Sequence, residues 1–225
     1  MKLRGDVQDE KKKGPQTLLE MILVVAISIL LFFFVQGLTW ALYFLPLTYV
    51  LIERRVRKRG WQEIGLKHAD FLSDLKSNWY LFLLVAIVIQ LLVVIGSRLW
   101  WPALFNQFMI RVEFLVDLYG QIAPFAIFFL LIALATLLEE VVYRGLIQER
   151  LGWFVGDRAA IIVASLVMAM VHLTFGEPLA MSADFLLVFL DSILYGLIYA
   201  RSRNIAVAWI AHLAADYMSL ILILL

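Results

Sequence analysis

Seven stretches of the chain are long and apolar enough, or nearly so, to cross a membrane whose hydrocarbon core is about 30 Å thick. Hydrophobic residues make up 64% of the 225 residues, which is more than a water-soluble protein of this size could cover. We therefore predict an all-α fold, a polytopic transmembrane helix bundle of about seven spans. The predicted spans are 18–36, 38–52, 79–99, 121–143, 158–175, 184–200 and 204–225.

The first two of these spans are the hardest to count. Met21 to Ile52 is about 48 Å long as a single α-helix, too long for one crossing and short for two. A turn at Gln36-Gly37 and a kink at Pro46 favour a hairpin of two helices, although six spans remain the alternative to seven.

Basic residues indicate the orientation of the bundle, since Lys and Arg accumulate on the cytoplasmic side of a membrane. Of the 19 Lys and Arg residues, all but Arg98 and Arg111 fall in the N-terminal tail or in the segments 53–78, 144–158 and 201–203. Seven spans place all of these segments on one side. We predict a multi-pass protein of the cell (inner) membrane with a cytoplasmic N-terminus and an external C-terminus.

Two domains follow from this arrangement. Residues 1–78 are expected to form a cytoplasmic basic tail, an N-terminal membrane hairpin and a basic loop, and residues 79–225 a membrane helix bundle. The net charge of +1 argues against a nucleic-acid partner, which requires a basic surface. The absence of cysteine excludes disulfides, thiolate metal ligands and a cysteine nucleophile.

Ionisable residues inside membrane spans are costly, and the default reason for keeping one is a function. Apart from Asp191, which we expect only to bond a neighbouring helix, they fall in the fourth, fifth and seventh predicted spans. They are Glu139, Glu140, Arg144, His172, His212 and Asp216. Measured along each helix from the nearest cytoplasmic basic residue, Glu139, His172, His212 and Asp216 lie about 13 to 21 Å deep and can meet in one layer of the cytoplasmic half.

Spacing within each helix predicts partners, because residues four apart share a helix face. Glu140 can pair with Arg144, and His212 with Asp216. A paired Glu140 would stay ionised and structural, which makes Glu139 the candidate general base. Each residue taken singly is more often a helix-packing clamp than a catalytic group, but the group at matched depth favours chemistry.

Three short motifs carry a resemblance to a known family. Residues 139–144 read EEVVYR and match an EExxxR motif, residues 168–172 read MAMVH and resemble FxxxH, and residues 212–216 read HLAAD and match a His followed four residues later by Asn or Asp. In order and inside spans, they resemble the CPBP family, the CAAX prenyl endopeptidases and bacteriocin-processing or self-immunity proteins. The similarity covers about 121–225, the expected peptidase core.

Two positions depart from the pattern of the prenyl endopeptidases. Met168 replaces the phenylalanine of the second motif, and Asp216 stands where those enzymes typically have asparagine. The second difference makes the third motif more acidic and moves the resemblance towards the broader prokaryotic branch of the family.

The resemblance implies an intramembrane endopeptidase that hydrolyses a peptide bond near the cytoplasmic side of the membrane, a membrane-embedded peptidase of glutamate type. Glu139 would activate the water with help from His172. His212 and Asp216 would orient or stabilise the tetrahedral oxyanion, and Glu140 with Arg144 would form the structural support. The expected partners are the lipid bilayer and a membrane-associated protein or peptide substrate.

A metal and two other functions remain as alternatives. Glu, His and Asp are all acceptable zinc ligands, so Zn²⁺ held by Glu139, His172 and His212 is the alternative to a metal-independent peptidase; the HExxH signature is absent. A non-catalytic immunity or scaffold protein could keep the same residues as clamps. A proton-coupled transporter is less favoured, because inverted repeats are not visible in the sequence.

Overall fold

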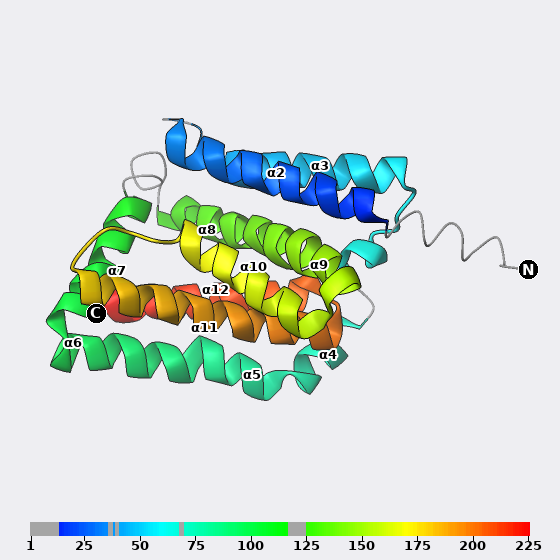
Figure 1. Cartoon of the computed structure of the whole chain (residues 1–225). Helices are drawn as coiled ribbons and strands as arrows, with labels where there is room; N and C mark the ends of the chain where they lie inside the picture. The colour runs from blue at the N-terminus through cyan, green and yellow to red at the C-terminus, as the bar shows by residue number, and fades with distance from the viewer. Residues whose placement is uncertain (1–13, 36–37, 39–40, 68–69, 117–124) are drawn as a thin grey trace, which may run out of the picture. The chain divides into compact units, whose positions relative to one another are not determined.

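The computed structural model describes residues 14–35, 38, 41–67, 70–116 and 125–225. In these residues the regular structure is helical throughout, which confirms the all-α prediction (Figure 1). The chain divides into two compact units, each built from two stretches of sequence. The first unit comprises Met1–Leu66 and Leu138–Ala164, and the second comprises Lys67–Leu137 and Ser165–Leu225.

The first unit is built on a helical hairpin. The elements α2 and α3 lie side by side and antiparallel (Figure 1), α3 also packs on η5, and α2 packs on α9. The end of α8 (Phe125–Glu140) and the start of α10 (Asp157–Val171) complete the unit. Its other elements are α2 (Pro15–Phe34), α3 (Ala41–Val56), η1 (Gln62–Ile64), η5 (Val141–Gln148) and α9 (Glu149–Val155).

The helix α3 owes its packing to a stripe of buried residues. Leu42, Pro46, Val50 and Glu53 follow one another at intervals of four, four and three, which keeps them on one face of a helix. Pro46 lies inside α3, and the helix continues past it. The predicted span 38–52 is therefore helical from Ala41 onward, while the predicted turn at Gln36-Gly37 lies outside the described residues.

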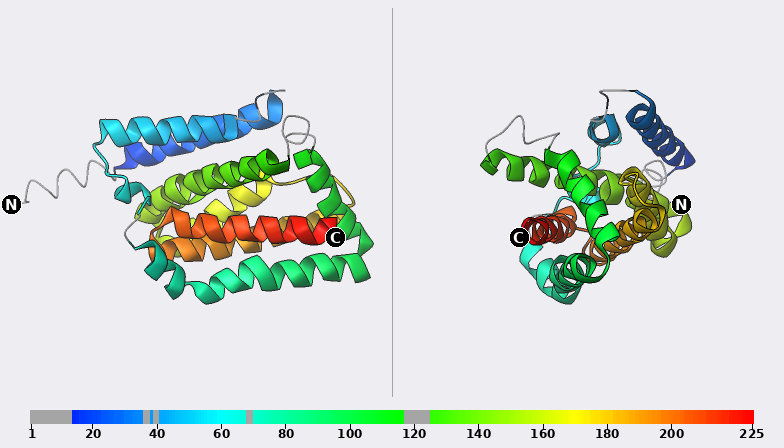
Figure 2. Two further views of the ribbon diagram at one scale, coloured as in Figure 1. Left: turned by 180° about the vertical axis from the view of Figure 1, so that it is seen from behind. Right: turned by 90° about the vertical axis from the view of Figure 1, so that its left-hand side faces the viewer.

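The second unit contains the longest helices. Residues 79–100 are helical without a break, α11 and α12 lie antiparallel, and α12 runs beside the 79–100 helix (Figure 2). The end of α10 and most of α8 belong to this unit as well. Its other elements are α4 (Phe71–Ser77), α5 (Trp79–Leu83), η2 (Leu84–Ile89), η3 (Leu91–Ile95), α6 (Gly96–Trp100), α7 (Pro102–Leu115), α11 (Pro178–Ser202) and α12 (Ile205–Leu224).

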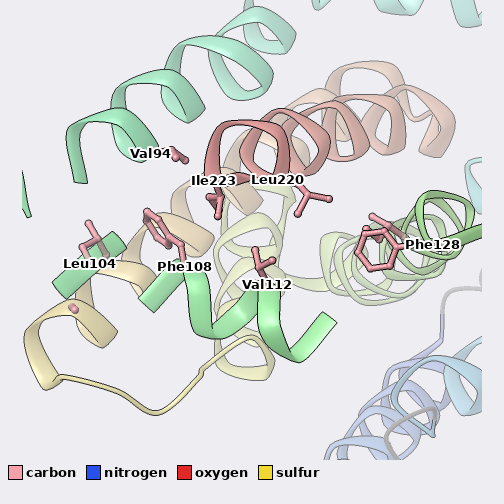
Figure 3. Packing of buried hydrophobic residues seen from close by; sticks show 9 residues of the cluster. Val94, Leu104, Phe108, Val112, Phe128, Leu220 and Ile223 are labelled. Atoms are coloured by element: carbon pink, nitrogen blue, oxygen red, sulfur yellow. The ribbon is translucent and has the colours of Figure 1, made fainter. Parts of the chain in front are cut away.

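A hydrophobic core of the second unit gathers around α7. Phe108 and Val112 of α7 point towards Leu220 and Ile223 near the end of α12 (Figure 3). Arg111, on the same helix, forms an ion pair with the buried carboxylate of Asp184 in α11. The helix α7, which follows the third predicted span, therefore packs through apolar contacts with α12 and through an ion pair with α11.

Four of the described helices are long and apolar enough to cross a membrane: Pro15–Phe34, Trp79–Trp100, Pro178–Ser202 and Ile205–Leu224. The other three predicted spans, 38–52, 121–143 and 158–175, correspond to the shorter elements α3, α8 and α10. The chain is a multi-pass integral membrane protein, and its span count is about seven.

Candidate functional site

The EEVVYR motif lies where one kind of helix gives way to another. Glu139 and Glu140 end α8, and Arg144 lies in η5, where the hydrogen bonds run over the wider π-helical turn. Short π-helical segments often mark functional sites. Spacing arguments assume α-helical geometry, and nothing in the residue types of this segment signals the change.

Glu140 and Arg144 form the ion pair that their spacing predicts. Nε of Arg144 lies 3.2 Å from Oε2 of Glu140, and both side chains are fully buried. Two charges removed from water in this way stabilise the fold only while both are present. The pair therefore fixes the start of η5 against the end of α8.

Glu139 has a partner that the sequence did not predict. The phenol of Tyr43, in the first turn of α3, donates a hydrogen bond of 2.9 Å to Oε1 of Glu139. Both residues belong to the first unit, and Glu139 is buried. The contacts of the two adjacent glutamates thus include a guanidinium at Glu140 and a phenol hydroxyl at Glu139.

His172 follows the last turn of α10. Its Nδ1 lies 2.8 Å from the backbone oxygen of Met168, the first residue of the second motif. Because a carbonyl oxygen only accepts, Nδ1 carries the hydrogen, and in the neutral ring Nε2 then holds the lone pair. Met168 therefore contributes to the motif through its backbone, which is independent of the side chain at this position.

His212 and Asp216 lie on one face of α12, as their spacing predicts. Nε2 of His212 is 3.7 Å from Oδ2 of Asp216; the ring is buried, whereas the side chain of Asp216 is 43% exposed. Tyr195 of α11 stacks on the imidazole, with ring centroids 4.6 Å apart and an interplanar angle of 20°. The stacked ring limits the orientations that His212 can adopt.

Asp191 bonds across to another helix, as we expected. Its Oδ2 accepts a hydrogen bond of 3.1 Å from the amide of Gln90, and Oε1 of Gln90 accepts one of 2.6 Å from Ser219. This short polar chain links α11 to α12 through the 79–100 helix.

The predicted site residues are divided between the units. Glu139, Glu140 and Arg144 belong to the first, and His172, His212 and Asp216 to the second. Their convergence on one cavity stays a prediction. Neither unit by itself gathers, among its described residues, three or more His, Cys, Asp or Glu side chains that could hold a metal ion.

A buried ionic cluster in the first unit was missed by the sequence reasoning. Glu53 accepts hydrogen bonds from Arg57 at 3.0 Å and from Arg150 at 2.6 Å, and Arg59 lies 3.0 Å away. The side chain of Arg150 is fully buried in this cluster. Because 97 residues separate Glu53 from Arg150, the sequence gives no local signal of their contact.

The comparisons with known proteins locate a family resemblance in the C-terminal part of the chain. Residues 121–218 match the family model described as type II CAAX prenyl endopeptidase, Rce1-like. Neither the curated proteins nor the solved structures gave a match. The matched segment contains all three motifs, which confirms the resemblance predicted from them. The part of the chain that carries the candidate site is therefore similar to the Rce1-like type II CAAX prenyl endopeptidases.

Proposed function

We propose that the protein is an intramembrane endopeptidase that hydrolyses a peptide bond of a membrane-associated protein or peptide near the cytoplasmic side of the membrane. The match of 121–218 to an endopeptidase family supports the reaction class. The finer assignment, a water activated by Glu139, depends on the contacts of the individual side chains.

One pair of contacts supports this assignment. Nε of Arg144 lies 3.2 Å from Oε2 of Glu140, and Oε1 of Glu139 accepts a hydrogen bond from the phenol of Tyr43. A carboxylate held by a guanidinium is a poor base, because taking up a proton would break a buried ion pair. A carboxylate held by a hydroxyl keeps its charge and can still accept a proton, which favours Glu139 as the base.

The proposed reaction uses each motif once. Glu139 takes a proton from a water while the water oxygen attacks the carbonyl carbon of the scissile bond, and His172 assists through Nε2. The protonated His212, whose positive charge an ionised Asp216 would stabilise, donates to the tetrahedral oxyanion. The carbon–nitrogen bond then breaks, and the proton held by Glu139 passes to the leaving amine.

Zinc remains the alternative to this metal-independent scheme. The donor set fits the metal, since Glu139, His172 and His212 offer one carboxylate and two imidazoles. In addition, Nδ1 of His172 bonds to the carbonyl of Met168, and zinc-bound histidines usually make such a hydrogen bond through the ring nitrogen that does not bind the metal. Those three residues would hold the ion. When bound, zinc would make a water a stronger acid and polarise the peptide carbonyl.

We also propose that the protein lies in the cell (inner) membrane with its N-terminus in the cytoplasm. This orientation is supported by the concentration of basic residues in the N-terminal tail and in 53–78. Substrate and water would then reach Glu139 from the cytoplasmic side.

The test is hydrolysis of a quenched fluorescent peptide by the full-length chain purified in detergent. Two probes are compared, a peptide ending in a prenylated Cys-Ala-Ala-X motif and the same peptide without the lipid. Glu139→Gln is expected to lower kcat at least a hundredfold, roughly the contribution of a general base, with an unchanged melting temperature. Incubation with 1,10-phenanthroline is expected to leave the wild-type rate intact.

Three outcomes would change the assignment. Loss of activity on chelation and recovery on adding Zn²⁺ would establish the metallopeptidase instead. A Glu139→Gln variant with wild-type kcat would remove Glu139 from the reaction and leave it a packing role, whereas a wild type that cleaves neither probe would favour a non-catalytic scaffold or immunity protein.

A further inference from the structure

We propose that Tyr43 is a positioning residue of the site: its hydroxyl holds the carboxylate of Glu139 in the orientation in which it acts on water. This inference depends on the proposed function of Glu139. It assigns part of the site to α3, which lies outside the segment 121–218 that matches the family.

The contact between these two residues has the geometry of a strong hydrogen bond. The distance of 2.9 Å from the phenol oxygen of Tyr43 to Oε1 of Glu139 is within the normal range for an O–H donor and an oxygen acceptor. An ionised acceptor makes such a bond about twice as strong as one between neutral groups. Because a glutamate side chain rotates about three bonds, a fixed donor on one oxygen restricts where the carboxylate points.

The backbone that carries Tyr43 is well anchored. The neighbouring Leu42 is 4% exposed, and the buried Pro46 in the next turn fixes its own φ angle. The same helix packs on η5, which begins directly after Glu140. A tyrosine ring has only two side-chain torsions, so its hydroxyl is held with little loss of conformational entropy.

The chemical nature of the donor suits a general base. An arginine at this place would form a second buried ion pair, like that of Arg144 with Glu140, and would oppose proton uptake by Glu139. A tyrosine hydroxyl stabilises the ionised form through one hydrogen bond and remains compatible with the protonated form. The N-terminal hairpin thereby contributes to chemistry that the family motifs place in the C-terminal half.

The chain offers a matched control for this contact. Tyr49 lies on the same helix, and its hydroxyl donates to Oε2 of Glu20, also at 2.9 Å. Phenylalanine at either position removes one oxygen atom and one hydrogen bond to a glutamate. Only the change at Tyr43 removes a bond to Glu139.

The experiment measures kcat, KM and thermal melting for the full-length wild type, Tyr43→Phe and Tyr49→Phe with the two peptide probes. Tyr43→Phe is expected to lower kcat about tenfold or more, the effect of losing a hydrogen bond to a charged group, with KM unchanged and a fall in melting temperature similar to that of Tyr49→Phe. Tyr49→Phe is expected to keep the wild-type kcat. Equal kcat values for wild type and Tyr43→Phe would overturn the proposal while leaving the peptidase assignment intact.

A second measurement does not depend on activity. Dicyclohexylcarbodiimide modifies protonated carboxyl groups in apolar surroundings, and mass spectrometry of proteolytic fragments locates the modified residue. Loss of the Tyr43 hydroxyl is expected to speed the modification of Glu139 several-fold relative to wild type and Tyr49→Phe. If wild type cleaves neither probe, the proposed function fails for these probes, and the labelling rates alone decide whether Tyr43 positions Glu139: equal rates overturn the inference.

Discussion

Adjacent glutamates acquire different roles from the residues that contact them. The pair of Glu140 with Arg144 could be predicted, because four residues separate them on one helix. The bond of Tyr43 to Glu139 could not be predicted, because 96 residues separate them and spacing rules apply only within one element. His212 and Asp216 lie four residues apart on one helix, so their contact could be predicted. Tyr195, which stacks on His212, lies on another helix, so that contact could not be predicted.

The fully buried pair predicts a change in stability at Glu140. Glu140→Gln leaves the guanidinium of Arg144 without its countercharge, and the expected loss is about 3–5 kcal/mol of unfolding free energy. Thermal or denaturant unfolding in detergent measures it. Glu139→Gln, measured beside it, is expected to keep wild-type stability, since the amide oxygen can still accept from Tyr43.

The reverse result is equally informative. A Glu140→Gln variant that is stable but inactive, beside an active Glu139→Gln variant, would exchange the two assignments and make Glu140 the base.

At the scale of elements, the basic run after α3 has a structural role in addition to its effect on orientation. Arg57 and Arg59 both contact Glu53, which also binds Arg150 of α9, and Arg57 reaches Glu20 of α2 at 2.8 Å. Burial, followed by the charge of Arg150, lowers the pKa of Arg59. The cluster therefore ties α2, α3 and α9 together within the first unit through one central carboxylate.

The central position of Glu53 predicts that its replacement is costly. Glu53→Gln leaves three guanidinium groups around a neutral amide, and we expect a loss of about 3–5 kcal/mol of unfolding free energy. Arg55→Gln is the control, because Arg55 is exposed on the same helix and its loss should change stability by less than about 0.5 kcal/mol. Unfolding curves of the two variants in one detergent provide the comparison; equal stabilities would mean that the cluster does not hold the helices.

At the scale of the whole molecule, hydropathy predicted the helices because a chain in lipid must satisfy its backbone hydrogen bonds internally. All seven predicted spans correspond to helices where the structure describes them. Two residues counted in the basic segment 144–158, Arg144 and Arg150, are buried and lie in helical segments. The remaining basic residues, apart from Arg98 and Arg111, still favour one side.

This asymmetry predicts the orientation of the chain. Alkaline phosphatase fused after Leu225 is expected to be active, because that enzyme matures only outside the cytoplasm, and the same fusion after Lys76 is expected to be inactive. Green fluorescent protein fused at each position gives the complementary readout. An inactive phosphatase after Leu225 would mean that one span, with 38–52 the first to re-examine, has been miscounted.

The ionic cluster at Glu53 also constrains the order in which the protein can be assembled during its synthesis. Arg57 and Arg59 follow Glu53 within six residues, whereas Arg150 is made 97 residues later. The hairpin can thus enter the bilayer with the charge of Glu53 already neutralised, and it need not wait for the rest of the chain. In the part of the chain that the structure describes, the carboxylate that Arg150 meets is that of Glu53, so we expect α9 to dock after the hairpin is in place.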